Sequence, residues 1–233
     1  MPTLSASYLT PRDWAAAERQ FYDTRPFNFT TLDDLLTEES CGELRDAIVA
    51  NKGWGFLNVA AKERVLFIRN FSSTLIPDVA GELKAKLPNL LGNLELVEYS
   101  AFMNRENDGL GIHSDNGQFT LNLYLTPDEF NLDPATGGMT LFDVKRASDQ
   151  PLHEFNSAER CTPYVRERTR GQAVMIGYKY NRGILFDAST FHAADRMRFR
   201  GGHARSHRIN LALRFDDRQA FRNRVAAYSH FNH

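Results

Sequence analysis

The sequence predicts an α+β fold in which a helical first part supports an all-β second part. Apolar residues recur with a helical period before residue 93, whereas short runs rich in β-branched and aromatic residues follow one another over 94–215. The 233 residues are 42% hydrophobic, enough for one sizeable core. Neither a repeat nor a Pro, Gly or Ser linker divides the chain. We therefore expect a single domain spanning 1–233.

The helical support is expected over residues 1–93. Residues 32–51 carry apolar side chains at helical spacing and predict one or two amphipathic helices, with 40–42 as the point of division. A further helix is expected over 75–87, because Ser72, Ser73 and Thr74 are residues that begin helices.

The β part consists of short segments separated by Gly, Asn, Asp or Pro. They read LELVEYSAFM, FTLNLYLT, GGMTLFDV, QAVMIGYKY, RGILFDAS and RINLALRF. Such a series is typical of a sandwich, a jelly roll or a barrel. Residues 143–170 interrupt it with a strongly charged stretch of little apolar periodicity, which predicts an insertion: either a lid over a substrate mouth or a solvated excursion. Residues 216–233 are expected to form a C-terminal tail.

Composition excludes several classes of function. Lys and Arg total 28 against 29 for Asp and Glu, so no overall charge favours nucleic acid or an anionic membrane. The two cysteines are too few to staple a fold of this size and fit a reducing compartment. The first twenty residues lack a basic start followed by an apolar stretch, so we expect a cytoplasmic protein with no membrane partner. The oligomeric state is left open.

A metal site is the main chemical hypothesis. His113 and Asp115 are two residues apart on extended backbone, so their side chains point to the same side and can share one ion. His192, in TFHAAD just after the apolar run ILFD, is the best placed third ligand. Two imidazoles and one carboxylate, with other positions open, are typical of non-haem Fe(II) oxygenases. An H-x-D triplet alone is common by chance, so its context matters.

The order of features after His113 supplies that context over residues 98–215. H-x-D, a strand ending in Tyr-Leu, a Gly-Gly turn, a distal His and a closing strand with Arg follow one another. The sequence here resembles the 2-oxoglutarate and Fe(II)-dependent dioxygenases, in particular the prolyl-4-hydroxylase-like branch. The resemblance implies a double-stranded β-helix (jelly roll), with Fe(II), 2-oxoglutarate as cosubstrate and O2. It also implies that His113, Asp115 and His192 hold the metal and are catalytic.

The same resemblance suggests four cosubstrate residues. Arg208 corresponds to the residue that pairs with the distal carboxylate of 2-oxoglutarate, and a guanidinium fork suits that task. Arg205 is the reserve candidate. Asn210 shares the face of Arg208 on the closing strand. Tyr124 resembles a tyrosine that reaches the same carboxylate, although a core tyrosine is the alternative, and Tyr99 resembles one that lies beside the cosubstrate.

We expect an enzyme that hydroxylates an unactivated C–H bond of a small molecule, such as an amino-acid-like metabolite. Asp115 occupies the position that related halogenases leave without a carboxylate, which favours hydroxylation. One alternative is a nucleic-acid or protein demethylase or a prolyl hydroxylase, because Arg208, Asn210 and Arg214 form R-x-N-x-x-x-R. The near-neutral charge disfavours nucleic acid. A non-enzymatic jelly-roll binding module is the third hypothesis.

Overall fold

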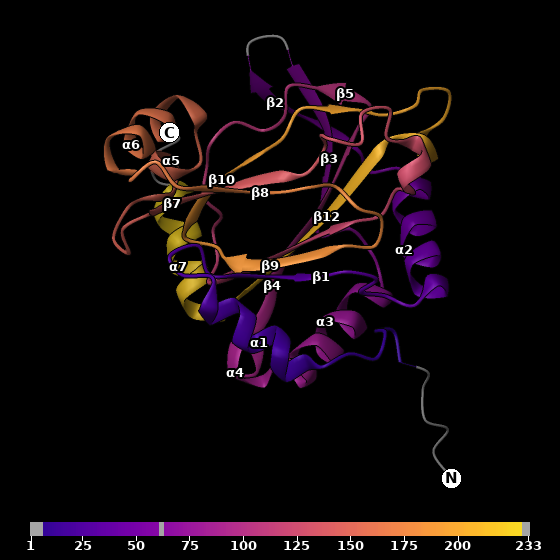
Figure 1. Ribbon diagram of the computed structural model, residues 1–233, viewed down its shortest axis with the longest axis horizontal. Helices are drawn as coiled ribbons and strands as arrows, with labels where there is room; N and C mark the ends of the chain where they lie inside the picture. Colours follow the sequence, from indigo (N-terminus) through magenta and orange to yellow (C-terminus); the bar gives the residue numbers. More distant parts are fainter. Residues whose placement is uncertain (1–6, 61–62, 230–233) are drawn as a thin grey trace.

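The computed structural model describes residues 7–60 and 63–229, and its core is a pair of facing antiparallel sheets (Figure 1). The larger sheet has seven strands in the order β1-β9-β6-β12-β4-β3-β2, and the smaller has three in the order β10-β7-β8. A two-stranded sheet pairs β11 with β5. This mixture of helices and antiparallel sheets is the jelly roll that the sequence predicts.

Each of the six predicted β segments corresponds to a strand, and six further strands of the described residues lie outside those segments. In the large sheet the strands are β1 (Phe29–Leu32), β9 (Gly183–Asp187), β6 (Phe119–Tyr124), β12 (Arg208–Asp216), β4 (Glu95–Asn104), β3 (Glu63–Arg69) and β2 (Gly55–Ala60). The small sheet contains β10 (Thr190–Ala194), β7 (Met139–Lys145) and β8 (Ala173–Ile176), and the short pair is β5 (Glu106–Asn107) with β11 (Met197–Arg198). One-turn 3-10 helices lie at Asp128–Phe130 and Ala204–Ser206.

Helices from the first part of the chain cover the outer face of the large sheet. They are α1 (Trp14–Asp23), α2 (Glu38–Ala50), α3 (Leu75–Lys86) and α4 (Pro88–Leu91). The Thr37 side chain caps α2 by accepting a hydrogen bond from the Ser40 amide. The buried residues of these helices form one core with Ile209, Leu211 and Leu213 of β12. The opposite face of β12 is thereby left to face the small sheet.

The first ninety-three residues are less helical than the sequence predicts. β1, β2 and β3 all belong to this region and extend the large sheet at both edges. In β3 the pattern ERVLFIR alternates: Val65 and Phe67 belong to one face, while Leu66 and Ile68 pack into the helical core. Sheet pairing with β4 therefore decides the structure of this segment.

Residues 143–170 are an ordered helical insertion between β7 and β8. The first three residues continue β7, and α5 (Leu152–Phe155) and α6 (Ala158–Arg168) follow. Their small apolar core consists of Val144, Phe155, Cys161, Val165 and Phe191. The Asp143 carboxylate closes the base of the insertion: it accepts hydrogen bonds from the Thr169 hydroxyl (2.5 Å) and the Arg170 amide (2.8 Å).

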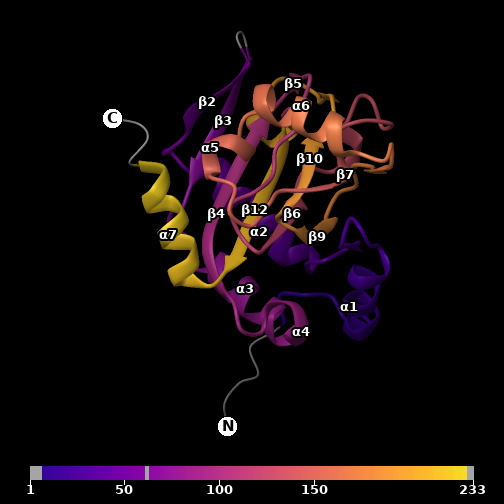
Figure 2. The ribbon, with the colours of Figure 1, turned by 90° about the vertical axis from the view of Figure 1, so that its left-hand side faces the viewer.

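The expected C-terminal tail contains a helix, α7 (Arg218–Ser229), which begins where the Asp217 carboxylate accepts from the Ala220 amide (2.8 Å). In Figure 2, α5 and α6 lie at the same end of the sheets as the β2–β3 hairpin, whereas α3 and α4 lie at the opposite end. None of the helices in residues 7–60 and 63–229 has the length and apolar character needed to cross a membrane.

Candidate metal centre and adjoining cavities

The three expected metal ligands meet between the two sheets. His113 lies in the segment between β5 and β6, and His192 lies in β10. The two histidines form a β-bridge in which each backbone N–H donates to the other's carbonyl, over 2.9 and 2.8 Å. The Asp115 amide donates to the Ala188 carbonyl (3.0 Å), which ties the H-x-D segment to the loop before β10.

The side chains of these residues form a cluster of the size that one metal ion needs. One ligand atom from each of His113, Asp115 and His192 lies within 4.8 Å of the other two. The His192 Nε2 and Asp115 Oδ2 atoms are 3.8 Å apart, and the imidazole centroids are 4.3 Å apart. Ligands about 2.1 Å from a shared ion lie roughly 3 to 4 Å from one another, so the cluster fits a metal with little adjustment.

Backbone carbonyls select the imidazole nitrogen that faces the cluster. The Nδ1 atom of His113 lies 2.8 Å from the Gly111 carbonyl, and that of His192 lies 3.0 Å from the Thr190 carbonyl. A carbonyl can only accept, so Nδ1 carries the proton in both rings. The unprotonated Nε2 atoms are left as donors for a metal.

Electrostatics sets the protonation states that metal binding requires. Burial lowers the pKa of His192 to about 4, and the charge of His113 contributes in the same direction. Burial is the largest single influence and would raise the pKa of Asp115, but the charge of Arg214 together with the two neighbouring histidines outweighs it and holds this pKa well below its ordinary value. Near pH 7 the site therefore holds an anionic carboxylate beside a neutral imidazole.

An ion-pair chain fixes the orientation of Asp115. Arg214 reaches Asp115 Oδ1 with Nη2 (3.4 Å) and Glu98 Oε1 with Nη1 (2.6 Å). The Ser100 hydroxyl accepts a further hydrogen bond from Arg214 (3.0 Å), and Glu98 Oε2 lies 3.3 Å from Arg69 Nε. Because Oδ1 is engaged by Arg214, Oδ2 is the oxygen of Asp115 that faces the histidines.

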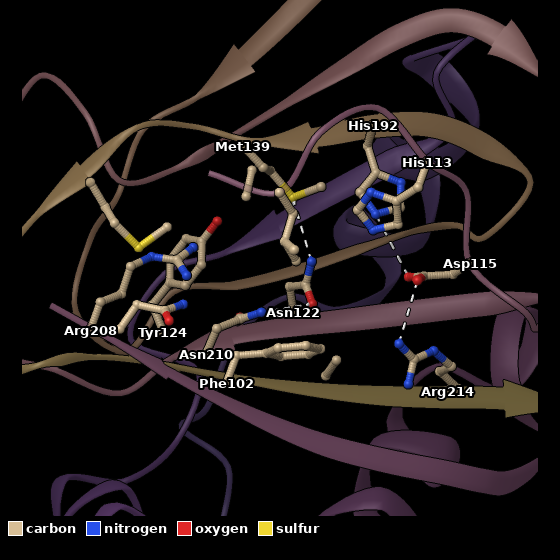
Figure 3. A pocket seen from close by; sticks show the side chains of 15 residues that line it. Phe102, His113, Asp115, Asn122, Tyr124, Met139, His192, Arg208, Asn210 and Arg214 are labelled. Atoms are coloured by element: carbon tan, nitrogen blue, oxygen red, sulfur yellow. Dashed lines mark hydrogen bonds and ion pairs between the residues drawn. The ribbon is translucent and has the colours of Figure 1, made fainter. Parts of the chain in front are cut away.

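A narrow inner cavity runs from this cluster along the inward face of the large sheet (Figure 3). The three ligands lie at one end, and Arg208 with Tyr124 lies at the other. Arg208 is only 4% exposed, its Nε donates to the Gly137 carbonyl (2.8 Å), and its guanidinium carbon lies 4.8 Å from the Tyr124 ring centroid. In the described part of the chain no carboxylate forms an ion pair with Arg208, so a buried cation faces the cavity without a counter-charge.

Two buried polar atoms beside Arg208 also lack partners. The Tyr124 hydroxyl and the Asn210 Oδ1 make no hydrogen bond to any residue that the structure describes. Asn210 does donate through Nδ2 to Asn122 Oδ1 (3.3 Å), and burial raises the pKa of Tyr124. Since buried polar groups in proteins almost always have partners, this end of the cavity is suited to a polar, anionic ligand.

Tyr99 and Arg205 lie elsewhere. Tyr99 is on the outer face of β4, packed against the helical core, and its hydroxyl donates to the Phe71 carbonyl. The inward positions of β4 are taken by Phe102 and Asn104, which line the cavity. The expectation for Tyr99 therefore fails on strand alternation, and the same alternation could have indicated Phe102. Arg205 forms an exposed ion pair with Asp46 (2.7 Å).

A larger outer cavity of about 480 Å³ adjoins the inner one on the other side of the metal cluster. The two cavities share His113, Asp115, Arg214, Phe102 and Leu110. The other walls of the outer cavity come from the β2–β3 hairpin and from residues 156–159, where α5 ends and α6 begins. Residues 156–159 of this segment thus border the cavity beside His113, and a lid function of 143–170 stays a prediction.

Neither a protein-family model nor a curated protein sequence matches this chain. Several solved structures, in contrast, are similar to this chain in fold. The α-ketoglutarate-dependent carbocyclase SnoK from nogalamycin biosynthesis has a TM-score of 0.64 at 15% identity, covering 89% of this chain and 87% of its own. HygX from Streptomyces hygroscopicus, with nickel and 2-oxoglutarate bound, has a TM-score of 0.58 at 12% identity, with coverages of 85% and 86%. EctD from S. alaskensis has a TM-score of 0.56 at 15% identity, with coverages of 93% and 83%.

These similarities define the fold: the chain has the jelly roll of 2-oxoglutarate-dependent non-haem enzymes. The similar structures include a carbocyclase and an epimerase, so the fold alone does not select a reaction. The prolyl-4-hydroxylase-like branch stays a prediction. The residues of the site must therefore carry the functional argument.

Proposed function

We propose that this protein is an Fe(II)- and 2-oxoglutarate-dependent oxygenase that hydroxylates a C–H bond of a small molecule. The observation that carries the proposal is the inner cavity. It has a His-Asp-His cluster at one end and a buried arginine without a counter-charge at the other. A dicarboxylate with a 2-keto group has a complementary arrangement of charges, with a metal-chelating end and an anionic end.

Each end of the cosubstrate has residues suited to it. His113, Asp115 and His192 would hold the metal, and Arg208 would pair with the distal carboxylate, with Tyr124 and Asn210 supplying further hydrogen bonds. When bound, Fe(II) with 2-oxoglutarate and O2 supplies the oxidising power that converts C–H to C–OH, leaving succinate and CO2. Phe102 and Leu110, which border both cavities, exclude water from the boundary between cosubstrate and substrate.

A small-molecule substrate agrees with the charges around the site. The alternative of a nucleic-acid demethylase requires arginines directed at phosphates. Arg214 instead faces Glu98 and Asp115 inside the protein, and Arg196 and Arg205 are engaged by Asp133 (3.1 Å) and Asp46 (2.7 Å). Among small molecules, an amino-acid-like metabolite remains our preferred substrate. The similar structures add examples, since SnoN has been solved with nogalamycin RO and HygX with hygromycin B.

Anaerobic titration with Fe(II) and 2-oxoglutarate tests the proposal. We expect stoichiometric binding of both and the visible absorption of an iron-chelated 2-keto acid. On admission of O2, a panel of candidate metabolites should include one that stimulates succinate formation and gains one oxygen atom by mass spectrometry. A protein that binds neither Fe(II) nor 2-oxoglutarate would instead be a non-enzymatic binding module, and a product formed without gain of oxygen would indicate cyclisation, desaturation or epimerisation.

A further inference from the structure

The outer cavity has an apolar floor formed by the extension of the large sheet. In the β3–β4 register Phe67 lies opposite Phe102, and their ring centroids are 5.1 Å apart. In the β2–β3 register Leu57 lies opposite Val65, which places it on the same face. Leu57, Phe67, Phe102 and Leu110 line the cavity. This floor suits the apolar body of a substrate.

The opposite wall is polar and comes from the helical insertion. Asn156, Ser157 and Glu159 line the cavity where α5 ends and α6 begins. In Figure 1 and Figure 2, α6 and the β2–β3 hairpin lie at the same end of the sheets. A molecule in the cavity is therefore held between an apolar sheet and a polar helix end.

One cation and one anion line this cavity without pairing with each other. Arg69 contacts Glu98 through Nε only, its guanidinium carbon lies 5.2 Å from the Phe67 ring centroid, and its side chain is 56% exposed. Glu159 makes no hydrogen bond or ion pair with any of the residues 7–60 and 63–229. The other charges in the cavity, Asp115 and Arg214, pair with each other. Arg69 and Glu159 are thus the charged groups available to a ligand.

We propose that the outer cavity selects a zwitterionic small molecule with an apolar body, which rests on the proposed function of the adjoining metal site. Arg69 binds the carboxylate, Glu159 binds the ammonium group, and the body lies on Phe67 and Phe102. Both residues are specificity-determining; neither contacts the metal ligands, and Arg69 is linked to Asp115 only through Glu98 and Arg214.

The charges disfavour the other classes of substrate. A neutral apolar molecule would gain nothing from Arg69 and Glu159, and both charges would lose solvent on its binding. A dianion or a nucleic acid would meet Glu159 as a like charge. The cavity volume of about 480 Å³ is in the range of sites for small ligands, about 300 to 1,000 Å³. A zwitterion with an apolar body complements both the apolar floor of the cavity and the charges of Arg69 and Glu159.

Equilibrium binding to protein loaded with Ni(II) and 2-oxoglutarate tests the inference without turnover. The probes are leucine, phenylalanine and cyclohexylalanine, each as the free zwitterion, the amide (cation), the N-acetyl derivative (anion) and the N-acetyl amide (neutral). We expect at least one zwitterion to bind about tenfold or more tightly than its singly charged and neutral derivatives, since each charged hydrogen bond adds about one order of magnitude.

Two variants test which residue binds the carboxylate of the ligand and which binds its ammonium group. Arg69→Gln should reduce zwitterion affinity about tenfold and abolish the preference for the free acid over its amide. Glu159→Gln, on an exposed helix end, should abolish the preference for the free amine over its N-acetyl derivative. Arg166→Gln and Glu167→Gln, both on α6 but outside the cavity, are the matched controls and should leave all affinities unchanged.

The outcomes separate the two proposals. If Ni(II) and 2-oxoglutarate bind but no zwitterion does, or if neutral derivatives bind as tightly, the zwitterion inference is overturned and the proposed function stands. If Ni(II) and 2-oxoglutarate fail to bind, the proposed function falls. Variants that lose affinity for all four derivatives equally would also overturn the roles assigned to Arg69 and Glu159.

Discussion

His113 and His192 exchange both of their backbone hydrogen bonds, so two of the three expected metal ligands are neighbours in a β-bridge. The main chain therefore sets their separation, and the imidazoles are aligned before any metal arrives. Their Nδ1 atoms are held by the Gly111 and Thr190 carbonyls. Such preorganisation limits the conformational entropy that metal binding must overcome.

Replacement of a single ligand should remove the metal and leave the fold intact. We expect His113→Ala, Asp115→Ala and His192→Ala each to lower iron occupancy at least about tenfold, because two ligands remain in a three-ligand site. Elemental analysis after reconstitution measures occupancy, and circular dichroism checks folding. His203→Ala, outside the cluster, is the control. Unchanged iron content in His192→Ala would show that another residue is the distal ligand.

Arg208 should dominate cosubstrate affinity. We expect Arg208→Ala to weaken 2-oxoglutarate binding about thirtyfold or more, since a desolvated arginine–carboxylate pair contributes at least about 2 kcal/mol. Tyr124→Phe removes one hydrogen bond and should cost about 1 kcal/mol. Calorimetric titration of the metal-loaded protein measures both. Arg205→Ala changes only a surface ion pair and should have no effect; an effect there and none at Arg208 would refute the assignment.

Arg214 should support both the metal site and the fold. Arg214→Met leaves Glu98 without its main partner and Asp115 without its orienting contact, in side chains that are largely buried. We expect a loss of about 3 kcal/mol in unfolding free energy and weaker metal binding. Arg218→Ala, which removes an exposed ion pair with Glu95, should cost far less in the same urea titration, because solvent screens that pair. Equal losses in the two variants would contradict this prediction.

The metal-free protein should lose stability as pH falls from about 6.5 to about 4. Over this window the unfolded chain protonates His192 whereas the folded protein does not, because burial lowers the folded-state pKa to about 4. The loss from this residue is at most about 3 kcal/mol. Urea titrations at several pH values should show a smaller decline in His192→Gln. The depressed pKa of Asp115 acts in the same direction at still lower pH, so an increase in stability on acidification would refute both assignments.

Gly138 should tolerate no side chain. A Cβ atom at this position would lie 2.0 Å from the Ile176 carbonyl oxygen, where β7 passes β8. Gly138 directly precedes the Met139–Ile176 pair and the Ile176 oxygen belongs to the backbone of that pair, so Gly138→Ala should destabilise the protein by about 3 kcal/mol. Gly177→Ala is the matched control, because a Cβ there meets no atom within 4 Å. Thermal denaturation compares the two, and a similar melting temperature would contradict the expectation.

Local periodicity predicts much of the secondary structure but little of the pairing between strands that are distant in the sequence. Residues 208–216 alternate so clearly that the inward face of Arg208 and Asn210 follows from sequence. The helix over 38–50 lies within the predicted segment 32–51 and continues unbroken through 40–42, and the helix over 75–86 follows from its apolar spacing and from Ser73, whose hydroxyl accepts from the Ile76 amide (3.2 Å). The strands β2 and β3 were missed because a short hairpin owes its structure to the partner strand β4, which lies far along the chain.

The site residues divide in the same way, into those that local sequence predicts and those whose position depends on distant strands. His113 and Asp115 are predictable because one short segment carries both. Tyr99 was misassigned because the register of β4 is set by its neighbours, and a shift of one residue moves a side chain to the other face. Arg69 and Glu159 carry no local signal; they line the same cavity only because the hairpin and the insertion lie at the same end of the sheets.

The Asp143 carboxylate, which holds both Thr169 and Arg170, has a consequence for how this protein can change. The segment from Asp143 to Thr169 leaves the small sheet at β7 and returns to it at the adjacent strand β8. The hydrogen bonds of Asp143 thereby join the two ends of this segment. The enclosed segment also supports the metal cluster, because the Phe155 carbonyl accepts from the Ser114 amide (2.8 Å) and Phe155 packs with Phe191 beside His192. If the proposed function holds, changes within this segment would alter the cavity wall at Glu159 and leave the sheet wall at Arg69 in place, so the two sides of the substrate site could diverge independently.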